Sequence, residues 1–334
     1  MTDSNQLFDS KLAARHRKGK IFSAICFLST WFSMAMLFIL LGSILWEGAS
    51  GLNWNFLTHY DSYDPKSAGI LGGIWGSFWL VLLTTVFSIP IGIGGAVYLE
   101  EYATQSRLTR IIQINLANLA GVPSIVYGIL GLSVFVYMFD LFRHDPKEIV
   151  LNLGIAKIYF PLPLGETVLA GALTLSLLIL PVVIVASQEA LRAIPPSIRH
   201  ASLALGATRW QTIRNQVLPS ALPGILTGVI LSISRAIGET APILVVGVVG
   251  FTVASPGNIE SPTQLLTDPQ GVANAPFDKY TALPAMIFEW ASRPGAEFRD
   301  HLSASGILVL LAVLLVLNGI AIYIRNKYSK RARW

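Results

Sequence analysis

Two residues of opposite charge, Arg235 and Glu239, lie within the apolar stretch 222–249. Residues four positions apart share one face of a helix. Because an isolated charge at the centre of a bilayer costs at least about 2.5–3.5 kcal/mol, both side chains need each other, another subunit or a water-filled path. A guanidinium presents a planar fork of donors that suits oxyanions. The pair therefore indicates either a self-neutralising structural contact or a path for an anion, in which Glu239 orients the guanidinium and keeps the empty path near neutral.

A polar segment at 194–219 separates two apolar stretches and is predicted to form a helix, a turn and a second helix. Pro195 and Pro196 end the preceding helix, and Ser197 is a good N-cap for the next one. Gly206 adopts a left-handed turn without strain and so closes the first short helix. The second helix leads into the next apolar stretch.

Apolar residues of this segment sit among basic ones, which predicts a short exposed helix with an apolar face and a basic rim. The residues concerned are Ile198, Ala201, Leu203 and Leu205, interspersed with Arg199, Arg209 and Arg214. A short exposed helix of this kind is suited to docking on another protein. The alternative is an ordinary loop between two membrane helices.

Composition places most of the chain in a membrane. Of its 334 residues 53% are hydrophobic and only 13% are charged, and the mean hydropathy is +0.59. Soluble globular chains carry about 25% charged residues, so this chain lacks the charge to cover a soluble surface. A membrane-spanning helix needs about 20 apolar residues. We predict an all-α polytopic membrane protein of about six transmembrane helices, at 21–46, 72–99, 111–141, 167–187, 222–249 and 306–324.

Three places depart from this simple outline. The third stretch is interrupted at 121–124, where Gly-Val-Pro-Ser predicts a short interfacial helix followed by the span itself. The apolar run 282–290 is predicted to form an amphipathic helix that lies on the outer face or dips partly into the membrane. The single cysteine, Cys26, is predicted to be a buried, unreactive thiol.

Lysine and arginine are distributed unevenly between alternate loops. The loops and ends of one phase hold Lys11, Arg15, Arg17, Lys18, Lys20, Arg107, Arg110, Arg192, Arg199, Arg209, Arg214, Arg325, Lys327, Lys330, Arg331 and Arg333. Those of the other phase hold Lys66, Arg143, Lys147, Lys157, Lys279, Arg293 and Arg299. The positive-inside rule therefore predicts that both termini face the cytoplasm. The pI of about 9.3 reflects this topology and does not indicate a nucleic-acid partner. The first apolar run exceeds the length of a signal peptide core and is expected to be retained.

The segment 194–219 resembles the EAA motif of ABC importer permeases. That motif runs Glu-Ala-Ala, three residues, Gly, nine residues, Ile, one residue and Leu-Pro. Aligned on Gly206, the spacing to Leu218 and Pro219 fits without a gap. The resemblance implies that this loop is the coupling helix, which fits a groove on the ATPase subunit.

The same alignment shows three departures from the motif. Ala201 matches its first alanine, whereas His200, Ser202 and Gln216 replace its glutamate, second alanine and isoleucine. A glutamate at position 200 would complete a capping box with Ser197, which His200 does not do in the same way.

The residues around the charged pair are similar to those of the PstA permeases of phosphate-specific ABC importers. The shared pattern is Arg-x-x-Gly-Glu-Thr-Ala-Pro at 235–242, and further matches occur at 123–128, 283–284 and 287–288. The resemblance covers about 72–324. It implies that Arg235, Glu239 and Thr240 line the substrate pathway.

The resemblance also implies partners and a location. A type I permease of this family translocates inorganic phosphate received from an extracytoplasmic binding protein (PstS-like), beside a homologous second permease (PstC-like) and an ATPase dimer (PstB-like), in the inner membrane. No Gly-x-x-x-x-Gly-Lys-[Ser/Thr] P-loop occurs in the sequence, so ATP is expected to be used by the partner and no cofactor, metal or catalytic residue is expected on this chain. The alternatives are a permease for another oxyanion and an ion-coupled secondary transporter.

We expect one membrane domain and no soluble domain of independent size. A cytoplasmic N-terminal segment at 1–20 precedes the transmembrane permease domain at 21–325, and a basic cytoplasmic tail follows at 326–334. Within the permease domain, the coupling loop spans about 188–219 and the outer segment about 250–305.

Overall fold

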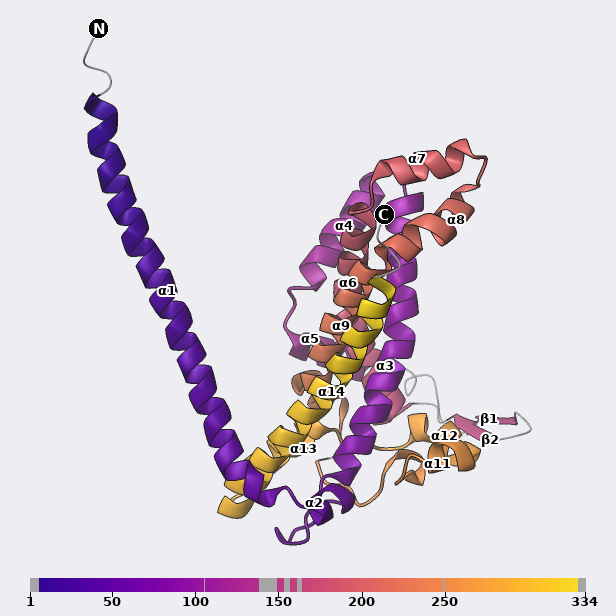
Figure 1. Ribbon diagram of the computed structural model, residues 1–334. Helices are drawn as coiled ribbons and strands as arrows, with labels where there is room; N and C mark the ends of the chain where they lie inside the picture. Colours follow the sequence, from indigo (N-terminus) through magenta and orange to yellow (C-terminus); the bar gives the residue numbers. More distant parts are fainter. Residues whose placement is uncertain are drawn as a thin grey trace.

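The computed structural model describes residues 6–104, 106–137, 149–152, 157–160, 164–248 and 250–329. Most of these residues are helical, and in the bundle α3 packs on α6, α6 on α9 and α9 on α14 (Figure 1). The α-helices are α1 Gln6–Gly48, α2 Trp54–Thr58, α3 Leu71–Val97, α4 Arg107–Leu119, α5 Ser124–Gly131, α6 Val168–Arg192, α7 Pro196–Ala204, α8 Arg209–Thr212, α9 Leu218–Gly238, α10 Ala241–Val246, α11 Gln264–Thr267, α12 Pro269–Asn274, α13 Leu283–Ser292 and α14 Ser303–Ser329. Short π-helical segments occur at Tyr98–Tyr102, Leu132–Tyr137, Ile213–Val217 and Glu297–Leu302.

Five continuous helical stretches are long and apolar enough to cross a membrane. They are Arg15–Gly51, Leu71–Tyr102, Val168–Arg192, Arg209–Gly238 and Glu297–Lys327. A sixth candidate is a bent pair, α4 with α5 and the π-helical turn that follows it. The predicted all-α membrane fold of about six spans is therefore confirmed, with the bent pair as the sixth. The ends of α1 and α14 that bear the termini point toward the end of the bundle that carries α7 and α8 (Figure 1).

The third predicted span is bent at the predicted place. The two arms, Arg107–Leu119 and Ser124–Tyr137, meet at 107°. Pro123 has extended backbone angles (φ −55°, ψ 136°) and no N–H to continue the helix. Leu116 of α4 packs against an apolar cluster formed by α3, α6 and α9, so α4 is part of the bundle. The remainder of this predicted span, at 138–141, lies outside the described residues.

The fifth predicted span, at 222–249, is not one helix. It divides between α9 and α10, with Glu239 and Thr240 outside both helices, and residue 249 lies outside the described residues. The physical reason is Pro242, since a proline ring clashes with the carbonyl four residues earlier and removes one helical hydrogen bond. The break falls beside Gly238, which has the least tendency to hold a helix together after proline.

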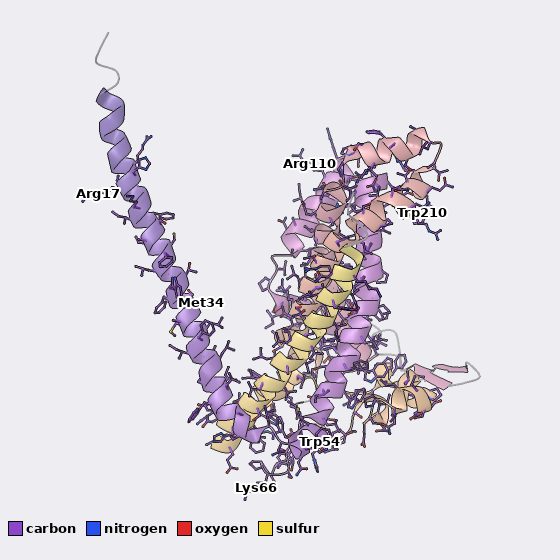
Figure 2. The ribbon with its side chains drawn as sticks, in the orientation of Figure 1. Arg17, Met34, Trp54, Lys66, Arg110 and Trp210 are labelled. Atoms are coloured by element: carbon purple, nitrogen blue, oxygen red, sulfur yellow. The ribbon has the colours of Figure 1, made fainter. Side chains whose placement is uncertain are left out.

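Helix α1 stands away from the bundle and joins it only near its C-terminal end (Figure 1). There Ser305 of α14 donates to the carbonyl of Gly48 at 2.8 Å. From Arg15 to Leu40 the side chains of α1 are exposed, as Arg17 and Met34 show in Figure 2. Cys26 is accordingly exposed, and the predicted burial of this thiol is wrong for the single chain. Because α1 begins at Gln6, it also continues into the predicted N-terminal segment at 1–20.

The end of the bundle opposite α7 is built from short elements. Helices α11 and α12 lie beside an antiparallel hairpin of β1 Ile149–Asn152 and β2 Lys157–Phe160, in which Ile149 pairs with Phe160 (Figure 1). This hairpin was not predicted. It adds two short strands to a fold that is otherwise helical within the described residues.

The helix predicted at 282–290 is α13, and its apolar face packs on the rest of the protein. Its Leu283, Met286 and Trp290 are completely buried in a cluster with residues from α2 and α14. One face of the helix is therefore part of the protein core at this end of the bundle. Sequence periodicity could not show this, because an amphipathic helix has the same pattern whether its apolar face meets lipid or protein.

Candidate functional site

The charged pair lies at the break between α9 and α10. Arg235 is in the last turn of α9, and Glu239 is the residue that ends it, with extended backbone angles (φ −75°, ψ 120°). Nε of Arg235 donates to Oε1 of Glu239 at 3.0 Å. The sequence left three possible partners for each charge: the other charge, another subunit or water. In the single chain the two side chains pair with each other. The predicted shared helical face is wrong, because Glu239 lies outside the helix.

The guanidinium of Arg235 is only partly used by this contact. Its side chain keeps 43% of its surface exposed, against 17% for Glu239. Nη1 and Nη2 make no hydrogen bond to any residue that the structure describes. A guanidinium has five N–H donors in a fixed fork. The edge formed by the two Nη atoms is therefore available to a ligand while Glu239 fixes the orientation of the group.

Thr240 follows the pair directly and precedes the first turn of α10. Its carbonyl accepts from the N–H of Leu244 at 3.1 Å, so its backbone belongs to that short helix. Its hydroxyl caps no backbone N–H and has no hydrogen-bond partner within the described part of the chain. Arg235, Glu239 and Thr240 therefore all lie at or beside the break, and the structure shows direct side-chain contact between the first two.

Helix α5 holds the break in place from the side. Gly128 lies so close to α10 that a Cβ atom there would be 2.8 Å from Cα of Pro242. The hydroxyl of Tyr127 donates to the carbonyl of Leu119 at 2.8 Å, which ties α5 to the end of α4. The ring of Tyr127 packs against apolar residues that include Ala236 of α9. The sequence pattern at 123–128 did not indicate this role.

The turn predicted at Gly206 is confirmed. Gly206 has φ +85°, and no atom lies within 4 Å of the position of a Cβ. Its N–H donates to Leu203 at 3.0 Å, and the N–H of Ala207 donates to Ser202 at 3.2 Å. This is the Schellman arrangement that ends many helices at a left-handed residue. The requirement for glycine is therefore one of backbone conformation and not of space.

The predicted N-cap at Ser197 is wrong. Helix α7 begins after Pro195, with Pro196 in its first turn and no side-chain cap. Proline suits this position because its fixed φ fits a helix and its missing N–H leaves one fewer unsatisfied donor. A capping box does occur in the loop, where Gln211 N–H donates to Thr208 Oγ1 at 3.3 Å and Thr208 N–H donates to Gln211 Oε1 at 2.8 Å. The pattern Thr-x-x-Gln at 208–211 was a readable signal for it.

The remaining predicted loop residues lie around a concave surface between α7 and α8. His200 and Ala201 are exposed on α7, and Ser202 Oγ is 2.9 Å from Oγ1 of Thr212. The concave surface encloses about 430 Å³ and is lined by Ile198, Ala201, Ser202, Leu205, Ala207, Gln211, Asn215 and Gln216. Leu205 is 90% exposed, and Trp210 projects from α8 (Figure 2). Such exposed apolar side chains at a loop are typical of a protein-docking surface.

One continuous stretch of helix joins this loop to the charged break. The helical stretch Arg209–Gly238 includes Leu218 and Pro219, which stand at the start of α9 without interrupting it. At 1.5 Å per residue it is about 45 Å long. The loop and the charged pair therefore lie at opposite ends of one continuous helical stretch.

Comparison with known proteins places the chain in a family. The family model described as "Binding-protein-dependent transport system inner membrane component" matches residues 88–333. The chain belongs to this family. It is also similar to the phosphate transport system permease protein PstA of Yersinia pestis, with 31% identity over 322 residues that cover 95% of this chain and 94% of that protein.

Other relatives match over a shorter range. The probable ABC transporter permease protein YqgI of Bacillus subtilis is 34% identical over 210 residues, which cover 63% of this chain and 64% of YqgI. The chain thus spans less than two thirds of the length of that relative. Among solved structures, a chain of a bacterial alginate ABC transporter has 15% identity and a TM-score of 0.59, with 94% of this chain and 96% of that chain covered. This likeness shows that the fold is that of an ABC importer permease.

Proposed function

We propose that this chain is the transmembrane permease subunit of an ATP-driven importer, and that its cargo is inorganic phosphate received from an extracytoplasmic binding protein. Family membership supports a role in binding-protein-dependent transport. The similarity to PstA of Yersinia pestis over nearly the whole chain supports phosphate as the cargo. The single observation that supports an anionic cargo is the free Nη edge of Arg235 at the helix break.

Arg235 suits an oxyanion for geometric and electrostatic reasons. Two N–H groups on one edge of a guanidinium donate in parallel to two oxygens of a phosphate. Because Glu239 already balances the charge, the empty site is close to neutral and does not bind the anion too tightly to release it. The interruption of the helix at Glu239 also leaves backbone groups that are not used in helical hydrogen bonds, as expected where a chain lines a water-filled cavity.

Glu239 favours phosphate over other oxyanions. Inorganic phosphate keeps at least one P–OH group at neutral pH, because its last proton leaves only in strongly alkaline solution. A carboxylate is an acceptor only. It therefore accepts a hydrogen bond from protonated phosphate and repels an anion without a proton, such as sulfate. This argument favours phosphate over the alternative of another oxyanion.

The partners follow from the same proposal. The docking surface of α7 and α8 would contact an ATPase subunit dimer that uses ATP, and the chain itself would bind no cofactor. A homologous second permease would complete the path, and a binding protein would deliver phosphate to the end that carries α11 and α12. The termini and α7 would then be cytoplasmic. Reporter fusions at Arg209 should report the inside and fusions at Pro276 the outside; residue 147, the other outer position, lies outside the described residues.

Phosphate uptake by a deletion strain tests the function. The strain complemented with this chain and its partner subunits should take up phosphate in an ATP-dependent manner, and excess sulfate should not compete. Arg235→Lys keeps the charge but loses the parallel donors, so uptake should fall sharply while the protein remains in the membrane. Arg110→Lys, on the exposed surface of α4, is the matched control and should transport normally.

Two results would overturn the proposal. Uptake that follows an ion gradient and persists without ATP would indicate an ion-coupled secondary transporter. Uptake of sulfate in place of phosphate would keep the ATP-driven permease and change the cargo to another oxyanion.

A further inference from the structure

A second set of charged residues lies between the end of α3 and the helical loop, far along the bundle from Arg235. Nη2 of Arg199, on α7, donates to Oε1 of Glu101 at 2.7 Å, and Nε donates to the same oxygen at 3.1 Å. Their side chains are 21% and 10% exposed. The sequence analysis placed Arg199 in a basic rim for docking. In the structure it points inward instead.

The other donors of Arg199 reach the end of α6. Nη1 donates to the carbonyl of Ile194 at 2.8 Å, and Nη2 donates to the carbonyl of Leu191 at 2.9 Å. Carbonyls at a helix C-terminus have no intrahelical partner, and a cation there is favoured by the helix dipole. All three nitrogens of one guanidinium are therefore used, and they join three elements: α7, α6 and the π-helical end of α3.

Glu101 has its own reason to need this partner. It belongs to Tyr98–Tyr102, the π-helical turn that ends the α3 helix. Carboxylates at a helix C-terminus are disfavoured by the dipole. Arg199 neutralises Glu101 and also donates to carbonyls at the end of α6. One side chain thus offsets both the unfavourable position of this carboxylate and the negative end of the α6 dipole.

Helix α7 has few other polar attachments. Apart from Arg199, its side chains make one hydrogen bond within the described residues, between Ser202 and Thr212 of α8. Ile198 adds apolar contact to the cluster formed by α3, α6 and α9. The contact with Glu101 is thus the polar link from α7 to the end of α3 within the described residues.

We infer that Arg199 and Glu101 form a rigid tie that transmits movement of the loop helix α7 to α3, so that Arg199 is a positioning residue for coupling and not a docking contact. This inference rests on the proposed ATP-driven function. A partner that pulls on α7 would move α6, α8 and α9 through the covalent chain, and would move α3 through this tie. Without the tie, only apolar packing around Ile198 would couple α3 to the movement of α7.

The neighbouring pair of Arg192 and Glu100 provides a matched control. Nε of Arg192 lies 2.8 Å from Oε2 of Glu100, but the arginine is 46% exposed and belongs to α6. It therefore has a similar contact to the same π-helical turn without any link to α7. The comparison separates the effect of the tie to α7 from the general effect of a lost surface charge.

The first experiment uses the complete complex in proteoliposomes. For Arg199→Gln and Glu101→Gln, the ATPase subunit should co-purify in wild-type amount, while the ATP hydrolysed per phosphate imported should rise about tenfold, as expected when a charge-assisted contact is lost. Arg199→Lys, which cannot reach Glu101 and both carbonyls at once, should be intermediate. Arg192→Gln and Glu100→Gln should keep the wild-type ratio.

The second experiment does not depend on the cargo. In a Cys26→Ser background, spin labels at Thr104→Cys and Ala204→Cys report the distance between the end of α3 and α7. With the tie intact, this distance should stay the same with and without a non-hydrolysable ATP analogue; with Glu101→Gln added, it should lengthen or broaden. If the wild-type complex imports no phosphate, the proposed cargo fails, and this distance still decides the role of the tie.

Two outcomes would overturn the inference. An unchanged distance and an unchanged ATP ratio in Arg199→Gln would show that α3 does not follow α7 through this contact. Loss of the ATPase subunit from Arg199→Gln, with a normal ATP ratio in the complexes that remain, would show that Arg199 is a docking contact after all.

Discussion

Gly128 of α5 lies directly against Pro242 of α10, where a Cβ atom would approach Cα of the proline to 2.8 Å. Pro242 explains why the fifth span breaks, and Gly128 explains how another helix closes on that break. The charged pair therefore occupies a site that is built from two interrupted helices. Its geometry depends on residues that carry no charge.

Substitution of Gly128 should damage transport without touching the charged pair. Gly128→Val should destabilise the protein by about 1–3 kcal/mol, because overfilling forces backbone and side chains to shift. The purified protein should melt at lower temperature, and phosphate uptake should fall. Gly94→Ala on α3, where no atom lies within 4 Å of the added carbon, is the control and should behave like wild type. Normal uptake by Gly128→Val would show that α5 does not hold the break.

The effect of replacing Gly206 should depend only on how readily the new residue adopts a left-handed backbone conformation. Gly206→Val places a β-branched residue at φ +85° and should cost roughly 1–2 kcal/mol, enough to misdirect α7. Gly206→Asn should be milder, since asparagine is the residue that most often replaces glycine at such positions. Co-purification of the ATPase subunit and uptake measure both. Equal effects of the two variants would contradict a conformational cause.

The capping box in the loop makes a separate prediction about stability. Thr208→Ala removes the side chain that accepts from Gln211 and should destabilise α8 by about 1 kcal/mol. His200→Glu should be tolerated but should not raise stability, because Ser197 is not the N-cap and no capping box can form there. Thermal unfolding of both variants in detergent gives the test. A clear stabilisation by His200→Glu would restore the cap first predicted from the sequence.

The end of the bundle opposite α7 depends on a buried ion pair. Asp61 is completely buried, and it accepts from Nη2 of Arg293 at 2.7 Å and from Nε1 of Trp290 at 3.0 Å. Asp61→Asn leaves the arginine without its counter-charge and should cost about 3–5 kcal/mol, as is usual when one partner of a buried pair is removed. Glu289→Gln serves as the control, because Glu289 is 45% exposed and lies 3.9 Å from the same arginine. A wild-type melting temperature for Asp61→Asn would contradict this account.

The sequence was sufficient for features that depend on local composition. Apolar length predicted the number of spans, the Gly-Val-Pro-Ser segment predicted the bend between α4 and α5, and Gly206 predicted a left-handed turn. Gly238 and Pro242 mark a place where the fifth span can kink, and the helix breaks between these two residues.

Features that depend on contacts between distant segments were not predictable. The burial of α13 and the exposure of Cys26 depend on which helices meet, and an apolar pattern is the same against lipid or protein. Arg199 looked like part of a docking rim because its partner, Glu101, lies 98 residues away in the sequence. Charge alone could not show in which direction that side chain points.

The central claim is that Arg235 binds the anion and that Glu239 is more than its counter-charge. Replacing both residues, as Arg235→Gln with Glu239→Gln, leaves no uncompensated charge in the membrane, so the protein should insert and assemble as stably as wild type. Phosphate uptake by the double variant, measured at equal membrane abundance, is the most direct test. We predict that uptake is lost. Recovery to near the wild-type rate would show that the pair is only structural, and the anion path would then lie elsewhere in the bundle.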